Sequence, residues 1–252
     1  MKLVLFDIDG TLTPARQEVR PDMLECLQKL NRQKDIDIGF VGGSDLRKQI
    51  EQLKEENFKL FKWRFSENGL LAFKDDQCIG KQSFVETLGE QHFKKFINIT
   101  LHVLSETDCP VKRGTFIEYR NGMLNISPIG RACSQSERDD FFKYDMQFNV
   151  RLDMIQKIDK LWKLYLKENL LILPEICFSI GGQISVDVFP KGWDKTYCLQ
   201  FVEDQYDEIY FIGDSTDKGG NDYEIYIDKR VKGYKVEKYQ DTIELLTTIF
   251  SL

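Results

Sequence analysis

The 252-residue sequence has no long apolar run. A helix that crosses a bilayer needs roughly 20 consecutive apolar residues, and no segment approaches that length, so we expect no membrane span. Met1-Lys2 leads directly into Leu3-Val4-Leu5-Phe6, without the longer apolar stretch and cleavage site of a signal peptide. We therefore expect a cytoplasmic protein that does not bind membranes.

The sequence also lacks paired cysteines and an excess of positive charge. Its six cysteines are scattered and form no C-x-x-C pair, which argues against a zinc site or a thioredoxin motif and favours reduced thiols. The net charge of −6 argues against broad binding of nucleic acid or membrane surfaces. A local basic cluster must therefore meet any anion that the protein binds.

The two ends of the chain predict an α/β core. Apolar runs at residues 3–6, 36–41 and 208–212 are typical of strands buried on both faces of a sheet. Helices are predicted at residues 22–30 and 46–54. Strand, helix, strand, helix is the pattern of a parallel sheet covered by helices.

The middle of the chain has a different pattern. Alternating runs at residues 115–120 and 123–127 flank Asn121-Gly122, a dipeptide typical of tight hairpins. A further strand is predicted at residues 183–188, and helices at 136–144 and 155–167. We therefore predict an antiparallel α+β cap domain at residues 83–187, inserted into a core formed by residues 1–82 and 188–252.

Four segments, far apart in the sequence, carry groups suited to phosphoryl transfer. Asp7 and Asp9 follow the first strand, where open α/β sheets bind ligands; Asp7 can attack phosphorus and Asp9 can act as general acid and base. The Ser44 hydroxyl can hold a phosphoryl oxygen, and Lys195 supplies a fixed cation. Oxygen ligands for Mg²⁺ and supporting contacts come from Gly213-Asp214 and Asn221-Asp222.

Each of these residues alone has a simpler explanation. The Asp7-Ile8-Asp9 segment could be a solvated turn, Ser44 a helix N-cap and Lys195 a surface lysine. Their joint, ordered occurrence favours the functional interpretation.

The same segments resemble the four motifs of the haloacid dehalogenase superfamily, and nearly the whole chain is similar to the eukaryotic-type phosphomannomutases. The similarity is carried by FDIDGTLTPARQ (6–17), VGGSD (41–45), and the segments 113–138, 179–200 and 219–226. The resemblance implies a haloacid dehalogenase-like Rossmannoid core with a parallel sheet, plus an inserted α+β cap with an antiparallel sheet.

The segment 113–138 is rich in arginine, whose planar guanidinium can bind a phosphate through two parallel hydrogen bonds. For Arg113 a solvated surface position is the better interpretation. The resemblance implies substrate contacts for Arg16, Arg120, Arg131, Arg138, Ser185 and Asp187. It also implies a Mg²⁺ site at Asp7, Asp9 and Asp214, and a second cation site at Tyr226 and Asp228. Ser215 departs from the family pattern, in which relatives carry a lysine.

The activity implied by the resemblance is isomerisation of mannose 6-phosphate and mannose 1-phosphate. It runs through phospho-Asp7 and a hexose 1,6-bisphosphate, which also serves as activator, and supplies mannose 1-phosphate for GDP-mannose. A homodimer through the cap is implied as well. Three alternatives stay open: a sugar-phosphate phosphatase of the same superfamily, a phosphoglucomutase, and a non-catalytic module that senses a bisphosphate.

Overall fold

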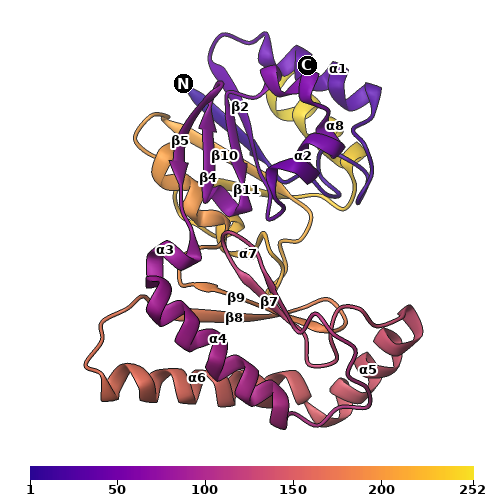
Figure 1. The fold of residues 1–252 in the computed structure, drawn as a ribbon. Helices are drawn as coiled ribbons and strands as arrows, with labels where there is room; N and C mark the ends of the chain where they lie inside the picture. Colours follow the sequence, from indigo (N-terminus) through magenta and orange to yellow (C-terminus); the bar gives the residue numbers. More distant parts are fainter. The chain divides into compact units, whose positions relative to one another are not determined.

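The computed structural model describes residues 1–252, and the chain divides into two compact units (Figure 1). We call Met1–Lys81 with Gly192–Leu252 the core unit, and Gln82–Lys191 the inserted unit. None of the helices combines the length and the apolar character needed to cross a membrane.

The core unit is built on a seven-stranded sheet in the order β11-β10-β1-β2-β3-β4-β5. Its strands are β1 (Lys2–Phe6), β2 (Ile36–Val41), β3 (Trp63–Ser66), β4 (Leu71–Lys74), β5 (Gln77–Lys81), β10 (Glu208–Gly213) and β11 (Lys232–Lys235). The strands from β11 to β3 are parallel, as predicted. The antiparallel pairs β3–β4 and β4–β5 extend one edge and were not predicted.

Helices cover both faces of this sheet because its central strands are apolar on both faces. In β1, Val4 and Phe6 pack into one core cluster, whereas Leu3 and Leu5 pack into another. The first cluster lies against α1 (Pro21–Asn31), α2 (Leu46–Leu53), η1 (Glu55–Leu60) and α8 (Tyr239–Phe250). The second lies against η3 (Lys195–Phe201) and α7 (Tyr223–Tyr226), and η2 (Glu67–Gly69) joins β3 to β4. Such double coverage is expected for parallel sheets.

The inserted unit contains an antiparallel sheet, as predicted, whose four strands lie in the order β6-β7-β9-β8; the strand β8 was not predicted. Its elements are α3 (Phe84–Leu88), α4 (Glu90–Glu106), β6 (Ile117–Tyr119), β7 (Leu124–Ile126), α5 (Gln135–Phe148), α6 (Val150–Glu168), β8 (Ile176–Gly181) and β9 (Ser185–Pro190). Backbone hydrogen bonds between Arg120 and Met123 close the hairpin turn at Asn121-Gly122. The sequence therefore located the hairpin correctly.

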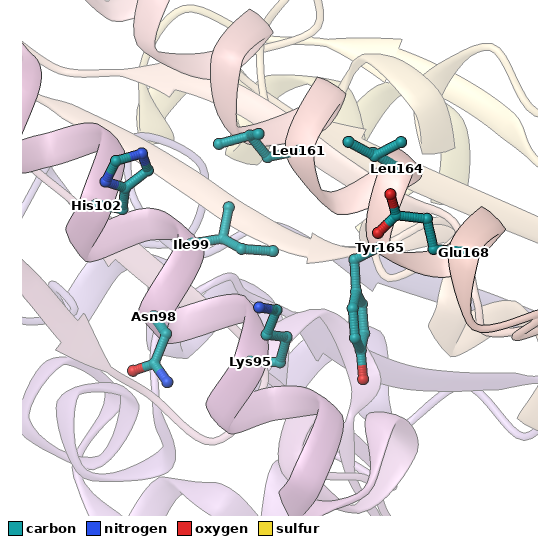
Figure 2. Close-up of a pocket in the computed structure, with 8 residues that line it drawn as sticks. All are labelled: Lys95, Asn98, Ile99, His102, Leu161, Leu164, Tyr165 and Glu168. Carbon is teal, nitrogen blue, oxygen red and sulfur yellow. The ribbon is translucent and has the colours of Figure 1, made fainter.

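Helices α4 and α6 pack on one face of this sheet. The Phe96 ring of α4 lies 5.2 Å from the Trp162 ring of α6 and 6.5 Å from the Phe178 ring of β8, between ring centroids. A groove of about 300 Å³ runs between the two helices, with Ile99, Leu161 and Leu164 among its apolar walls (Figure 2). Successive side chains along β8 point to opposite faces of the sheet, and α4 and α6 cover only one of these faces.

Candidate active site

Asp7, Lys195 and Asp222 form a buried ionic cluster in the core unit. The Lys195 ammonium donates to a carboxylate oxygen of Asp7 and, at 2.5 Å, to Asp222 Oδ1. Lys195 is 1% exposed and Asp222 is fully buried. The cluster forms because Asp7 directly follows β1, which ends at Phe6, while η3 begins at Lys195. The other Asp222 oxygen accepts from the backbone N–H of Ser215.

Two glycines make room for the carboxylates around this cluster. Gly10 has φ +79°, and a Cβ there would lie 2.3 Å from Asp214 Oδ2. A Cβ on Gly213 would lie 2.5 Å from Asp222 Oδ2. Both distances are far below van der Waals contact, so any side chain at these positions would displace an aspartate of the cluster. The backbone conformation of Gly10 also favours glycine.

Burial sets the protonation behaviour of these groups. Desolvation raises the pKa of the Asp7 carboxyl to about 7, although the Lys195 charge opposes the shift. Burial lowers the pKa of the Lys195 ammonium, but Asp7 and Asp222 outweigh it, so the net shift is upward and the lysine stays charged. Burial, followed by repulsion from Asp222, raises the pKa of Asp214. In the protein alone, the single positive charge of Lys195 therefore does not compensate the burial of these carboxyl groups.

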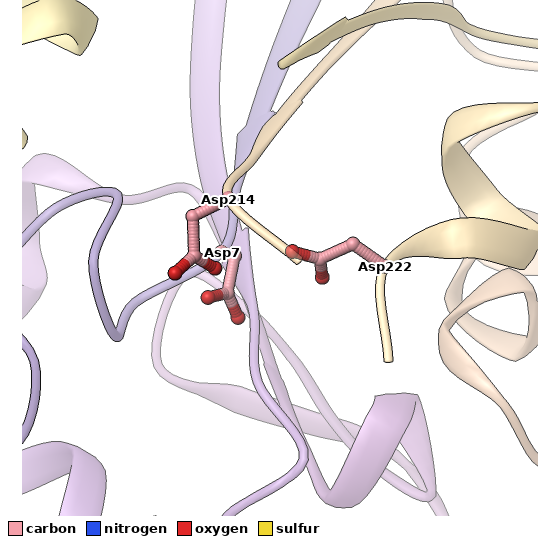
Figure 3. Close-up of side chains that lie close together, drawn as sticks. All are labelled: Asp7, Asp214 and Asp222. Atoms are coloured by element: carbon pink, nitrogen blue, oxygen red, sulfur yellow. The ribbon is translucent and has the colours of Figure 1, made fainter. Parts of the chain in front are cut away.

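Asp7, Asp214 and Asp222 are arranged as ligands for a metal ion. One ligand oxygen from each lies within 4.8 Å of the others, and Figure 3 shows Asp7 and Asp214 adjacent, with Asp222 approaching from the start of α7. Three carboxylates beside one ammonium carry a net charge of −2, which a divalent cation would balance. All the donors are hard oxygens, the ligands that Mg²⁺ prefers. The residues fit a magnesium ion.

The cluster brings Asp222 together with two of the predicted metal residues, Asp7 and Asp214, whereas the Asp9 side chain lies outside it, so Asp9 as a metal residue stays a prediction. Asp9 Oδ1 instead accepts from Gln52 Nε2 and from the backbone N–H of Arg16, both at 2.7 Å. Asp9 Oδ2 lies 3.8 Å from Lys48 Nζ. Two donors on one oxygen fix the orientation of the carboxyl group and leave Oδ2 available for proton transfer.

Ser44 and Arg16 lie in the core unit, and their side-chain functional groups are not hydrogen-bonded within the protein. Asp45 is the N-cap of α2 and accepts from the backbone N–H of Lys48, so capping does not engage the Ser44 hydroxyl. The Arg16 guanidinium has no hydrogen-bond partner, and its backbone has φ +59°. A hollow of about 580 Å³ is lined by Gly10, Asp214 and residues of the loops around them.

The uncovered face of the sheet in the inserted unit carries a polar row that crosses the strands. Register places Glu118 of β6 opposite Asn125 of β7, Asn125 opposite Asp187 of β9, and Asp187 opposite Ser179 of β8. Asn125 Nδ2 donates to Asp187 Oδ1 at 2.6 Å. Antiparallel pairing therefore joins residues that lie up to 62 positions apart.

The predicted arginines of this unit converge on that row. Arg131 donates through Nε to Glu118, and through Nη1 to Asn125 Oδ1 at 2.5 Å and Ser185 Oγ at 3.4 Å. Arg120 Nε donates to the other Glu118 oxygen at 3.2 Å. Arg138 Nη2 donates to the Arg131 carbonyl at 2.9 Å. Arg120, Arg131, Arg138, Ser185 and Asp187 are thus brought together, as one cluster with Glu118 and Asn125. In contrast, Arg113 pairs with Glu137 at the start of α5.

A buried ion pair lies next to this cluster and anchors the turn beside it. Arg151 of α6 pairs with Asp145 of α5, Nε to Oδ2 at 2.8 Å, and both side chains are at least nine-tenths buried. Arg151 Nη1 also donates to the carbonyls of Gly182 and Ser185. The turn between β8 and β9 is therefore anchored next to Ser185.

The predicted second cation site has different contacts. Asp228 forms an ion pair with Arg230, at 2.7 Å between Oδ2 and Nη2, and Arg230 also meets Glu203 at 2.6 Å. Its carboxylate thus has an arginine for a partner, and Tyr226 belongs to the short helix α7 beside it. A second cation there stays a prediction.

Sequence reasoning did not identify four polar residues of these sites: Lys48, Gln52, Glu118 and Asn125. Gln52 is 5% exposed and Asn125 is 4% exposed. No sequence signal marks the burial of Asn125, because in Leu124-Asn125-Ile126 it stands at the polar position of an alternating strand. Buried amides occur where hydrogen-bond partners are present.

Comparisons with solved structures bear on the fold. The chain is similar to the trehalose-6-phosphate phosphatase of Aspergillus fumigatus, with a TM-score of 0.61 at 15% identity, covering 100% of this chain and 93% of that one. It is also similar to an IMP-nucleotidase of Plasmodium falciparum, with a TM-score of 0.58 at 16% identity and coverage of 100% and 68%. These likenesses confirm the predicted fold class, a haloacid dehalogenase-like core with an additional α+β unit.

Comparisons of sequence identify the family. The family described as eukaryotic phosphomannomutase matches residues 23–252. The phosphomannomutase of Schizosaccharomyces pombe is 51% identical over 254 residues, covering 99% of this chain and 95% of the relative. The phosphomannomutase of Dendrobium officinale is 52% identical over 242 residues, covering 96% and 91%. These matches confirm the resemblance seen in the sequence. The chain therefore belongs to the eukaryotic phosphomannomutase family of isomerase enzymes.

Proposed function

We propose that this chain interconverts mannose 6-phosphate and mannose 1-phosphate. Support comes from about 50% identity, over nearly the whole chain, to proteins named phosphomannomutase. The observation that carries the proposal is the grouping of Asp7 with Lys195 and Asp222, together with the separately oriented Asp9 carboxyl. In the cytoplasm, the product mannose 1-phosphate would supply GDP-mannose synthesis.

Asp7 acts as the nucleophile in this proposal. Its carboxylate attacks the phosphorus of a hexose 1,6-bisphosphate to give phospho-Asp7, and the sugar oxygen leaves with a proton from Asp9 as part of a hexose monophosphate. Lys195, beside Asp7, stabilises the negative charge of the transferring phosphoryl group. Asp9 then accepts the proton of the attacking hydroxyl in the return step. The Ser44 hydroxyl is available to donate to a phosphoryl oxygen.

Mg²⁺ is the proposed cofactor, held by Asp7, Asp9 and Asp214 as the resemblance implies, with Asp222 completing the acidic cluster around Asp7 and Asp214. Bound there, it would offset the repulsion between the carboxylates and the phosphate and keep Asp7 ionised. The chain's own contribution is a buried, preorganised set of oxygens, because Gly10 and Gly213 let Asp214 and Asp222 approach closely.

The inserted unit supplies the second phosphate site in the proposal. Arg120, Arg131 and Arg138 hold the phosphate that is not reacting, and Ser185 and Asp187 hold the sugar. A hexose 1,6-bisphosphate formed at Asp7 turns over and returns its other phosphate. The same bisphosphate activates the enzyme by phosphorylating Asp7. The Arg16 guanidinium, which has no protein partner, is the proposed substrate contact from the core unit.

We also propose a homodimer through the inserted unit. Support comes from apolar side chains of α5 that are exposed to solvent, with Phe142 40%, Met146 70% and Phe148 53% exposed. Apolar side chains gathered on one element are typical of interaction surfaces. Light scattering at micromolar concentration should give the mass of a dimer, and a monomer mass would contradict the proposal.

The test of the function is a coupled assay with mannose 1-phosphate, Mg²⁺ and a trace of hexose 1,6-bisphosphate, with free phosphate followed in parallel. We expect mannose 6-phosphate to exceed released phosphate, and no product from Asp7→Ala. Glucose 1-phosphate in the same assay measures phosphoglucomutase activity. Excess free phosphate would identify a phosphatase, and absence of mannose 6-phosphate with the native chain would refute the proposal.

A further inference from the structure

Asn125 occupies a position where an asparagine is costly unless it is bonded. It lies at the centre of β7 between Leu124 and Ile126, both fully buried, and is itself 4% exposed. Asparagine is disfavoured in strands, and a buried amide without partners is destabilising. The side chain must therefore be explained by its hydrogen bonds.

Both ends of the Asn125 amide meet charged groups of opposite sign. The Oδ1 atom accepts from Arg131 Nη1 at 2.5 Å, and Nδ2 donates to Asp187 Oδ1 at 2.6 Å. A guanidinium only donates and a carboxylate only accepts, so the two partners fix which end of the amide faces which. An aspartate could serve Arg131 but would repel Asp187, and a leucine could serve neither.

These bonds set the geometry of the whole polar row. Arg131 is held on one side by Glu118 through Nε and on the other by Asn125 through Nη1, and its Nη2 has no partner in the protein. Asp187 is held by the same amide. The distance between the free edge of the guanidinium and the carboxylate therefore depends on the one side chain that bridges them.

We propose that Asn125 is a positioning residue that fixes Arg131 and Asp187 relative to each other and so couples recognition of phosphate to recognition of the sugar. The inference rests on the proposed function, in which Arg131 binds a phosphate and Asp187 binds sugar hydroxyls. Asn125 does not itself touch the substrate. Its contribution is to hold two recognition groups at the spacing of a hexose phosphate.

The test compares two substitutions with a matched control. Asn125→Asp keeps the acceptor for Arg131 and places an oxygen against Asp187, whereas Asn125→Leu removes both bonds. The control is Thr100→Val, which removes another buried hydrogen bond of the inserted unit, from Thr100 Oγ1 to the Phe96 carbonyl on α4. Thermal unfolding of all three variants measures the general cost of losing a buried bond.

We expect Asn125→Asp to raise the KM for mannose 1-phosphate and glucose 1-phosphate at least about tenfold because its carboxylate repels Asp187, with a larger rise for Asn125→Leu because Asp187 and Arg131 both lose a hydrogen-bond partner. Hydrolysis of acetyl phosphate, which has no sugar, should change less than about twofold because it needs only Asp7 and its neighbours. Thr100→Val should change neither the KM for the hexose phosphates nor the rate of acetyl phosphate hydrolysis. Calorimetric titration of mannose 1-phosphate into Asp7→Asn, with and without Asn125→Asp, should show the same loss of affinity in the absence of turnover.

A KM within twofold of the native value for Asn125→Asp would overturn the inference, as would an equal loss of hexose phosphate and acetyl phosphate turnover, which indicates a purely structural role. Arg131→Lys separates this failure from failure of the proposed function. A raised KM for Arg131→Lys beside a normal Asn125→Asp rejects the inference alone. No binding or turnover of hexose phosphates by the native chain rejects both.

Discussion

The core unit and the inserted unit each gather charged side chains, but with opposite sign and different burial. In the core unit Asp7 and Asp222 share Lys195, which is inaccessible to solvent, and Asp214 lies beside them. In the inserted unit, Arg120 and Arg131 share Glu118, and the side chains of these two arginines are 41% and 30% exposed. One site is arranged to hold a cation beside a nucleophile, and the other is arranged to hold an anion.

The difference in burial determines how each site responds to substitution. Removing one partner of a buried ion pair leaves an uncompensated charge and costs about 3–5 kcal/mol, whereas exposed pairs contribute little. The buried site suits catalysis because electrostatic interactions there are weakly screened and stabilise the transition state more strongly. The exposed site suits reversible binding, because a phosphate can reach the arginines from solvent and leave again. We therefore expect core substitutions to affect stability and chemistry together, and arginine substitutions to affect binding alone.

The largest expected effect comes from Lys195→Met. It leaves Asp7 and Asp222 buried without their shared cation, so turnover of hexose phosphates should fall by at least about 10³-fold. The free energy of unfolding of the metal-free protein should fall by about 3–5 kcal/mol. Urea unfolding with and without Mg²⁺ measures the loss and how much of it the ion restores.

The control is Lys235→Met, which removes an exposed lysine that pairs with Asp217 in the same unit. It should leave activity and the urea midpoint nearly unchanged. Equal urea midpoints for the two variants would contradict the distinction between buried and exposed charge.

Arg131→Lys should have the next largest effect, and on binding rather than stability. Lysine keeps the charge but loses the fork that meets Glu118 through Nε and Asn125 through Nη1. We expect the KM for mannose 1-phosphate to rise about 10- to 100-fold, with little change in thermal unfolding.

Arg113→Lys is the matched control, because Arg113 belongs to the same sequence segment but pairs with Glu137 instead of joining the cluster. Its KM should equal that of the native chain. A similar rise in both variants would mean that general charge, not the polar row, attracts the substrate.

Gln52→Met should produce a smaller and more selective loss. Without the amide donor, Asp9 Oδ1 keeps only the backbone N–H of Arg16, and the carboxyl group becomes less ordered. Proton transfer to a sugar oxygen should slow by about tenfold, whereas acetyl phosphate, whose leaving group needs no proton, should react at nearly the native rate. Single-turnover rates of Asp7 phosphorylation by hexose 1,6-bisphosphate and by acetyl phosphate give the comparison, because steady-state hydrolysis also includes the attack of water on phospho-Asp7, which needs Asp9.

Gln33→Met is the control, since the Gln33 amide donates to the Phe250 carbonyl in the same unit. It should slow neither substrate. Equal slowing of hexose phosphate and acetyl phosphate by Gln52→Met would show that Gln52 supports the fold instead of orienting Asp9.

The sequence predicted the parallel core and the antiparallel hairpin because their signals are local. Strand β1 is an apolar run, β2 begins and ends where its apolar run does, and Asn121-Gly122 marks a turn between adjacent strands. Helices α4 and α8 were not predicted, although each buries an apolar face. The motif residues Asp7, Ser44, Lys195 and Asp214 could be placed because they occur at or near strand ends.

Residues that position others could not be predicted in the same way. Gln52 reaches Asp9 across 43 positions, and Asn125 reaches Asp187 across 62. Their roles depend on register and on helix orientation, which single-sequence patterns do not determine. The same reason explains why the contact that Asp222 shares with Asp7 through Lys195 could not be predicted.

The smallest expected change in the free energy of unfolding, taken per pH unit, is a pH dependence confined to the core site. Burial raises the pKa of Asp7 from an ordinary value of 3.8 to about 7 in the metal-free protein. Between about pH 4 and pH 7, Asp7 is therefore protonated in the folded state and ionised in the unfolded state. The contribution of Asp7 to stability is fully present below pH 4 and is lost as the pH rises through 7, by at most about 1.4 kcal/mol per pH unit.

Urea unfolding of the metal-free native chain and of Asp7→Asn, at intervals from pH 5 to pH 8, isolates this contribution as the difference between the two curves. The difference should decline with rising pH without Mg²⁺. Added Mg²⁺ should reverse its slope, because the ion binds the ionised carboxylate and stabilises the folded state more strongly as the pH rises. Arg131 bonds to Glu118, Asn125 and Ser185 of the inserted unit, so Arg131→Lys should leave the pH dependence caused by Asp7 unchanged. A difference curve that rises with pH in the absence of Mg²⁺ would show that Lys195, and not burial, controls the protonation of Asp7.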